Sequence, residues 1–119
     1  MARVILIEDD GLVRTLLMRN MVACGFTVTA LRDGRELDRV LADAHADLLV
    51  IDLGLPYMDG FAVVEGLRAR GHTIPVLIIS AYELPHLTDS ARSAGANDLL
   101  QKPFEQDELI ARMRRLLAA

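Results

Sequence analysis

The stretch Leu48-Leu49-Val50-Ile51-Asp52 is apolar up to its last residue, where a carboxylate follows the aliphatic side chains. Two further runs have the same apolar character, Val4-Ile5-Leu6-Ile7 and Val76-Leu77-Ile78-Ile79. None of the three alternates apolar with polar residues, and each is rich in β-branched side chains. Strands covered on both faces have this composition. The three runs therefore predict the central strands of a parallel sheet.

Weaker strands are predicted at residues 26–31, which alternate as an edge strand does, and at residues 98–101. Apolar residues at helical spacing lie between the strands. A thinner helix, from Pro85 to about Ala94, has few large apolar side chains and should bury little area. The expected helical stripes are Leu12, Val13, Leu16, Leu17 and Met21; Leu37, Val40 and Leu41; Phe61, Val64 and Leu67, with Asp59 as N-cap; and Leu109, Ile110, Met113, Leu116 and Leu117.

The elements therefore alternate strand and helix five times along the chain. Right-handed crossovers with helices on both faces give a doubly wound α/β fold. We expect a five-stranded parallel sheet of order 2-1-3-4-5, the flavodoxin-like arrangement. No repeat, low-complexity tract or linker interrupts the 119 residues, so residues 1–119 are interpreted as one domain.

Composition excludes several classes of protein. The net charge of −4 disfavours direct binding of nucleic acid, which needs a basic face. No apolar run approaches the roughly 18 residues of a membrane span. The N-terminus lacks the layout of a signal peptide. We therefore expect a cytoplasmic protein with no membrane partner. The single cysteine, Cys24, is interpreted as a small core residue.

Polar residues follow the predicted strands at the edge where a doubly wound sheet binds its ligands. Neighbouring strands lie roughly 4.8 Å apart, so acids after strands one and three should crowd together and repel. A hard divalent cation would relieve this repulsion, and Mg²⁺ suits a site with few carboxylates. The residues at this edge are Glu8, Asp9 and Asp10 after the first strand, Asp52 after the third, Ser80 after the fourth and Lys102 after the fifth.

This group of side chains suits phosphoryl transfer. The carboxylate of Asp52 can act as a nucleophile and form an aspartyl-phosphate. Lys102 supplies a positive charge and Ser80 a hydroxyl donor. Each residue alone is more simply read as a surface group at the start of a loop, but their joint placement at one edge favours the chemical interpretation.

Four motifs contain these residues: Ile7-Glu8-Asp9-Asp10; Asp52-Leu53-Gly54-Leu55-Pro56 followed by Met58-Asp59-Gly60; Ile79-Ser80-Ala81; and Lys102-Pro103-Phe104. They resemble the motifs of response-regulator receiver domains, the CheY-like family, and the resemblance covers essentially the whole chain. The family implies that Asp52 accepts a phosphoryl group from a sensor histidine kinase or a histidine phosphotransfer protein.

The resemblance also implies a role for each remaining site residue. Mg²⁺ would be bound directly by Asp9, through water by Glu8, by Asp52 itself and by a backbone carbonyl of Gly54. The other implied roles are contact with the phosphoryl group for Ser80, charge pairing for Lys102 and a cis peptide bond before Pro103.

Two positions bear on how phosphorylation would change the domain. Many relatives carry Tyr or Phe three residues before the lysine, where this chain has Leu99. We hypothesise that phosphorylation is coupled more weakly, or through other residues, to the output surface, the face through which such a domain signals. Tyr82, two residues beyond Ser80, borders the phosphorylation site in similar proteins. Its ring would restrict attack by water and lengthen the lifetime of the phosphoryl group, whereas an outward-facing tyrosine would have no kinetic effect.

Three other functions are alternatives for such a chain. An Asp-nucleophile phosphatase usually has a second Asp two residues after the nucleophile, where this chain has Gly54. A flavin mononucleotide protein needs a neutral phosphate-binding loop after the first strand, and the acids at residues 8–10 would repel phosphate. A pseudo-receiver that acts without phosphorylation is the main alternative, although the set of acids, hydroxyl and lysine disfavours it.

The last residues also resemble a known group, less strongly than the site does. Residues 107–112 are similar to the final helix of winged-helix transcriptional regulators of the OmpR/PhoB type. The chain is therefore either a stand-alone regulator or the receiver of such a protein. In the second case, phosphorylation would favour a homodimer through the last two helices and the last strand.

Overall fold

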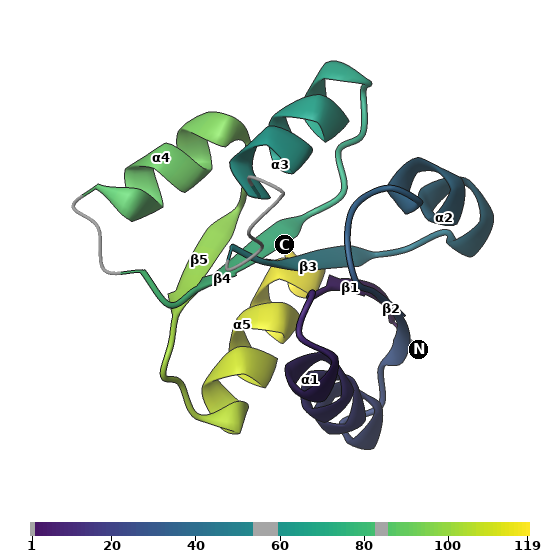
Figure 1. Cartoon of the computed structure of the whole chain (residues 1–119), viewed down its shortest axis with the longest axis vertical. Coiled ribbons are helices and arrows are strands. Elements are labelled where there is room, and N and C mark those ends of the chain that lie inside the picture. Colours follow the sequence, from purple (N-terminus) through teal and green to yellow (C-terminus); the bar gives the residue numbers. More distant parts are fainter. Residues whose placement is uncertain (1, 54–59, 83–85) are drawn as a thin grey trace.

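The computed structural model describes residues 2–53, 60–82 and 86–119. Five strands form one parallel sheet of order β2-β1-β3-β4-β5, which confirms the predicted topology (Figure 1). The expected N-cap Asp59 lies outside the described residues, as does Pro85. The elements are β1 (Arg3–Ile7), α1 (Gly11–Ala23), β2 (Thr27–Leu31), α2 (Leu37–Ala44), β3 (Leu48–Asp52), α3 (Gly60–Ala69), β4 (Val76–Ser80), α4 (Leu87–Ala94), β5 (Asp98–Gln101) and α5 (Gln106–Ala118).

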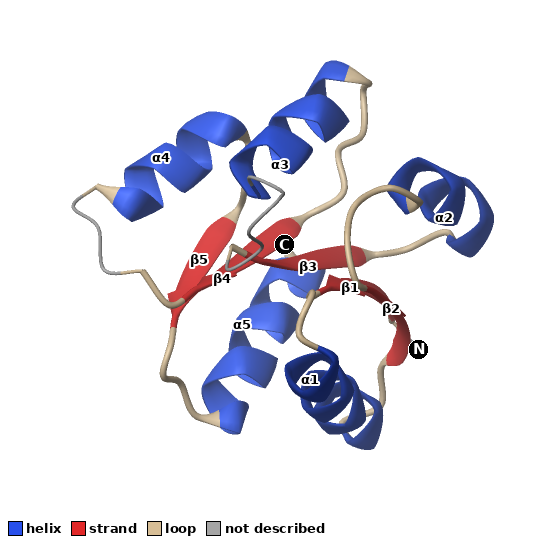
Figure 2. Ribbon diagram, viewed as in Figure 1, coloured by secondary structure: helices blue, strands red, loops and turns tan. Residues whose placement is uncertain are grey.

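Helices cover both faces of the sheet, with α1 and α5 on one side and α2, α3 and α4 on the other (Figure 2). Alternate residues of each central strand enter different cores. In β1, for example, Val4 and Leu6 pack towards α1 and α5, whereas Ile5 and Ile7 pack towards α2 and α3. Every residue of β3 and β4 is buried. The lack of polar alternation in these runs therefore reflects burial on both faces.

The first helix differs from the expected apolar stripe. Leu17 and Met21 are buried, but Leu12 and Leu16 are 70% and 51% exposed. Successive residues of a helix lie about 100° apart, so the face that buries residues 17 and 21 turns residues 12 and 16 towards solvent. Both faces are apolar in the sequence, and the periodicity alone does not select between them.

The second strand begins one residue later than predicted. The N–H of Phe26 donates to the carbonyl of Met21 at 3.1 Å and so closes the end of α1 instead of pairing in the sheet. Gly25, at the same turn, has a φ of 97°, which a residue without Cβ adopts readily. The side chain of Phe26 is buried as expected.

The fourth helix is as thinly packed as the sequence predicted. Its buried residues are Ala91 and Ala94. Gly95 ends it at a φ of 111°, and its N–H donates back to the last turn. Packing by two methyl side chains buries far less apolar area than the Leu109, Ile110 and Met113 side chains of α5.

The register of the sheet brings the ends of its strands together. Ile7 pairs with Ile51, Asp52 with Ile79, and Ser80 with Gln101. The residues that follow β1, β3, β4 and β5 therefore meet at one edge. Within the described part of the chain, no helix is long and apolar enough to cross a membrane.

Candidate phosphorylation site

Asp52 and Lys102 form the centre of this edge. Asp52 ends β3 and is 2% exposed, and the Nζ of Lys102 donates to its Oδ2 at 2.5 Å. The backbone N–H of Lys102 donates to the carbonyl of Ser80 at 2.7 Å, which fixes the chain after β5 to the end of β4. The peptide bond between Lys102 and Pro103 is cis, as the resemblance implied.

Glu8 is the second buried acid of the site. It is 3% exposed, and its Oε1 lies 3.7 Å from the Nζ of Lys102. Burial, a hydrogen bond with Asp52 and the charge of Asp52 together raise the pKa of Glu8 to about 8. Burial lowers the pKa of Lys102, but its hydrogen bonds to the two acids and their charges outweigh this effect and leave the pKa above its ordinary value. The positive charge of Lys102 therefore interacts with both carboxyl groups.

The donor set fits a hard divalent cation. The buried carboxyl groups of Glu8 and Asp52 lie close together, and the raised pKa of Glu8 favours its protonated form. A cation that prefers oxygen ligands would stabilise both groups as carboxylates. Asp9 lies beside them in sequence but is exposed. Among the described residues, no group of three or more His, Cys, Asp or Glu side chains is arranged to hold a metal ion. Gly54, the expected carbonyl ligand, lies outside those residues.

Ser80 is fully buried at the end of β4. Its Oγ accepts a hydrogen bond from the backbone N–H of Tyr82 at 3.0 Å. The hydroxyl is thus held at the same edge as Asp52, because residue 52 pairs with residue 79 in the sheet. The predicted grouping of Asp52, Ser80, Lys102 and Glu8 at one edge is present in the structure.

Two residues support this edge in roles that the sequence analysis did not assign to them. The Oδ1 of Asp10 accepts from the N–H groups of Leu12 and Val13 at 2.9 and 3.0 Å, so Asp10 is the N-cap of α1. The Nη1 of Arg14 donates to the backbone carbonyls of Glu8 and Asp9. An acid directly before a helical stripe is a readable capping signal, whereas nothing in the sequence indicates the contact of Arg14.

Leu99 and Tyr82 line the same cavity. Leu99, on β5, is partly buried and packs against the core beneath α2, α3 and α4. Tyr82 is 54% exposed, and its carbonyl accepts from the Nε2 of Gln101 at 3.3 Å. Both residues line a cavity of about 340 Å³ that also reaches Leu87 of α4. The cavity leaves room beside Leu99 for a larger side chain.

Comparisons with a family model and with known proteins agree on one family. The family model of the response regulator receiver domain matches residues 4–114. The response regulator MprA of Mycobacterium ulcerans (strain Agy99) is 38% identical over 115 residues, which cover 97% of this chain and 50% of the relative. The chain thus spans about half the length of the curated relatives it matches.

Solved structures agree with the same family. The receiver domain of the Francisella response regulator 1452 superposes with a TM-score of 0.91 at 30% identity, covering 99% of this chain and 98% of that one. The chemotaxis response regulator CheY4 of Vibrio cholerae superposes with a TM-score of 0.85 at 26% identity, covering 98% of both chains.

Proposed function

The chain belongs to the response regulator receiver domain family of two-component signalling systems, and we propose that Asp52 is its phosphorylation site. The observation that carries this proposal is the buried Asp52 carboxylate at the end of β3 with the Nζ of Lys102 at 2.5 Å. A buried carboxylate at a sheet edge, paired with a cation, is poised to attack an incoming phosphoryl group.

The transfer exchanges one bond at phosphorus for another. A carboxylate oxygen of Asp52 forms the new P–O bond while the bond from phosphorus to the donor's histidine nitrogen breaks, and that nitrogen keeps the electron pair. The ammonium group of Lys102 then shifts from the Asp52 carboxylate to the oxygens of the transferred phosphoryl group and pairs with them. The hydroxyl of Ser80 donates a hydrogen bond to the same group once it turns from its present place beside the N–H of Tyr82.

Mg²⁺ is the proposed cofactor, and when bound it would neutralise negative charge on the acids and the phosphoryl group. Its proposed ligands are Asp9, Asp52, the backbone carbonyl of Gly54 and, through water, Glu8. Burial and the neighbouring Asp52 raise the pKa of Glu8, which supports this assignment, because a cation would allow both buried acids to be ionised.

The proposed phosphodonor is a sensor histidine kinase or a histidine phosphotransfer protein in the cytoplasm. An apolar cavity of about 530 Å³ beside Lys102 supports this partner, since Val13, Leu17 and Phe104 line it next to the lysine. The exposed Leu12 and Leu16 extend the apolar surface along α1. A helix of the donor that packed on this surface would bring its histidine to Asp52.

The proposed output is a change of the face formed by α4, β5 and α5, which neighbours Ser80 and Lys102. The chain would serve as a phosphorylation-dependent switch and not as an enzyme with a small-molecule substrate. It would act alone or as the receiver of an OmpR/PhoB-type regulator that dimerises through this face. The buried residues of α4, Ala91 and Ala94, are both alanines, so little apolar contact holds the helix in place. This supports a surface that can move.

Modification by acetyl phosphate tests the assignment. We expect the purified protein to gain one phosphoryl group in the presence of Mg²⁺ and none in EDTA, as measured by intact mass or a phosphate-binding gel. Asp52→Asn should abolish the modification. The matched control Asp43→Asn, an exposed acid on α2, should leave it intact. Equal modification of both variants would overturn the proposal and favour a pseudo-receiver or another acceptor.

A further inference from the structure

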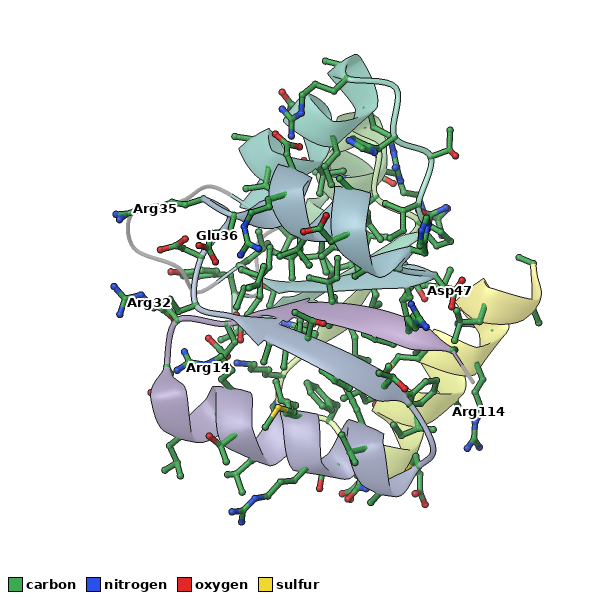
Figure 3. The ribbon with its side chains drawn as sticks, turned by 90° about the vertical axis from the view of Figure 1, so that its right-hand side faces the viewer. Arg14, Arg32, Arg35, Glu36, Asp47 and Arg114 are labelled. Carbon is green, nitrogen blue, oxygen red and sulfur yellow. The ribbon has the colours of Figure 1, made fainter. Side chains whose placement is uncertain are left out.

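A polar cavity lies at the end of β2, where Arg14 of α1 also lines it. It has a volume of about 430 Å³, within the range of clefts that hold small ligands. Figure 3 shows three arginines along this edge of the molecule, Arg14 from α1 and Arg32 and Arg35 from the connection between β2 and α2. This arginine cleft is lined by Arg14, Ala30, Leu31, Arg32, Asp33, Arg35 and Glu36.

The acids of the arginine cleft already have arginine partners. Asp33 accepts from the backbone N–H of Arg35 at 3.0 Å and lies 3.6 Å from its Nε. Glu36 pairs with Arg39, at 3.1 Å between Oε2 and Nη2. These carboxylates therefore compensate the charges of Arg35 and Arg39 rather than those of Arg14 and Arg32.

Two of the guanidinium groups keep unused donors. Arg14 is half-buried and is held by its Nη1 on the carbonyls of Glu8 and Asp9, which leaves its Nε and Nη2 without a protein partner among the described residues. Within that same part of the chain, Arg32 makes neither a hydrogen bond nor an ion pair. The cleft thus presents one fixed and one adaptable guanidinium on a chain whose net charge is −4.

We propose that the arginine cleft binds a compact small molecule that carries a phosphate or diphosphate group, held by Arg14 and Arg32. A planar guanidinium meets two phosphate oxygens with parallel N–H donors, which gives both orientation and charge pairing. Because Arg14 is fixed before binding, its ordering adds little entropic cost.

The surroundings favour a small ligand over a macromolecule. Asp33 and Glu36 line the same cleft as the arginines, so the cationic surface is short and does not match the successive carboxylates of an acidic peptide. A nucleic acid needs an extended basic stripe, which an isolated cluster on an acidic chain does not provide. A phosphate group needs only the two or three donors that Arg14 and Arg32 supply.

Titration with pyrophosphate tests this proposal, in EDTA and at about 0.15 M salt, where long-range surface attraction is largely screened. We expect calorimetry to give one site with half-saturation on the order of 1 mM or lower. In amide NMR spectra, the shifts should centre on residue 14 and residues 30–36. Arg32→Gln should weaken binding by about tenfold, because a charged hydrogen-bonding partner is lost.

A control variant separates this site from a general effect of charge. Arg19→Gln removes an exposed arginine from α1 outside the cleft, and it should not change pyrophosphate binding. Weakening by Arg19→Gln equal to that of Arg32→Gln would reduce the effect to general charge and overturn the proposal.

Two further results would also overturn it. Shifts centred on residues 52, 80 and 102 would place the anion in the phosphorylation site. Binding of a glutamate-rich peptide that depends on Arg32, without binding of pyrophosphate, would assign the cleft to an acidic protein partner. Unchanged urea unfolding of Arg32→Gln would show that the variant is folded, as expected for an exposed side chain.

Discussion

β3 and β5 end at the same edge of the sheet, but they are built differently. All five residues of β3 are buried, up to and including Asp52. In β5 only Leu100 of the four residues is buried, and the neighbouring α4 contributes two buried alanines. Asp52, the proposed acceptor, thus lies in a densely packed part of the fold, whereas the surface formed by β5 and α4 beside it is thinly packed. Thin packing permits local rearrangement at low cost, so this surface can rearrange while β3 stays in place.

The largest expected effect is on stability, from matched truncations of two leucines. Leu77 is fully buried on β4, and Leu77→Ala should lower the free energy of unfolding by about 2–5 kcal/mol. Leu99 is half-buried on β5, so Leu99→Ala should cost less than half as much. Urea unfolding followed by circular dichroism gives both values. Equal costs would show that the β5 edge is as firmly packed as the centre of the sheet.

The next effect is the pH dependence of stability that the buried acids produce. Folded Glu8 holds its proton up to about pH 8, whereas the unfolded chain releases it near 4.5. Between these values the unfolded state binds fewer protons, so the free energy of unfolding falls as pH rises through the window. In EDTA we expect the Tm to decrease by about 5 °C or more between pH 5 and pH 8.

Variants of the two acids assign this slope. Glu8→Gln should flatten it, because the titrating group is gone. Asp52→Asn should reduce it, because the hydrogen bond and charge that help to raise the pKa of Glu8 are removed. The exposed control Asp43→Asn should keep the slope. A slope that survives Glu8→Gln would mean that another group causes the pH dependence.

Sequence patterns predict the fold well where one pattern has one structural solution. Strands without polar alternation have to be buried on both faces, and parallel strands place their following residues at one edge, so the sequence alone is enough to group Asp52, Ser80 and Lys102. Prediction fails where two structures fit the same pattern equally well. In α1, residues 12 and 13 are both apolar, as are residues 16 and 17, and only the packing of the helix decides which of them face solvent.

Contacts between distant residues are also beyond the reach of sequence patterns. Arg14 and Arg32 line one cavity because β2 pairs with β1 and returns the chain beside the start of α1. Neither arginine belongs to a motif or a periodic pattern. Their proximity follows from tertiary structure alone.

A smaller effect is expected at Leu99, where β5 carries an aliphatic side chain. The cavity of about 340 Å³ beside Leu99 has room for an aromatic side chain. Leu99→Tyr should strengthen the response of α4 to phosphorylation, seen as larger amide NMR shifts at residues 87–94 on addition of beryllofluoride. If the native protein already shows shifts as large as the variant does, Leu99 does not weaken the coupling.

The smallest expected effect concerns the lifetime of the phosphoryl group. The backbone N–H of Tyr82 donates to the Oγ of Ser80 at 3.0 Å, so residue 82 is held at the rim of the site. A ring at this rim should restrict the approach of water to an aspartyl-phosphate. Tyr82→Ala should therefore lose phosphate about threefold faster, a change of about 0.6 kcal/mol in the barrier. The measurement is the decay of the phosphorylated protein after the donor is removed.

Tyr82→Phe separates the ring from its hydroxyl. If the bulk of the ring shields the site, the Phe variant should decay as slowly as the native protein. If the hydroxyl holds the ring in place, Phe and Ala variants should decay at the same higher rate. Because the side chain is 54% exposed, an outward-facing ring is the competing arrangement, and an Ala variant that decays no faster would establish it. In that case, the thinly packed face would influence the output of the switch and have no effect on its chemistry.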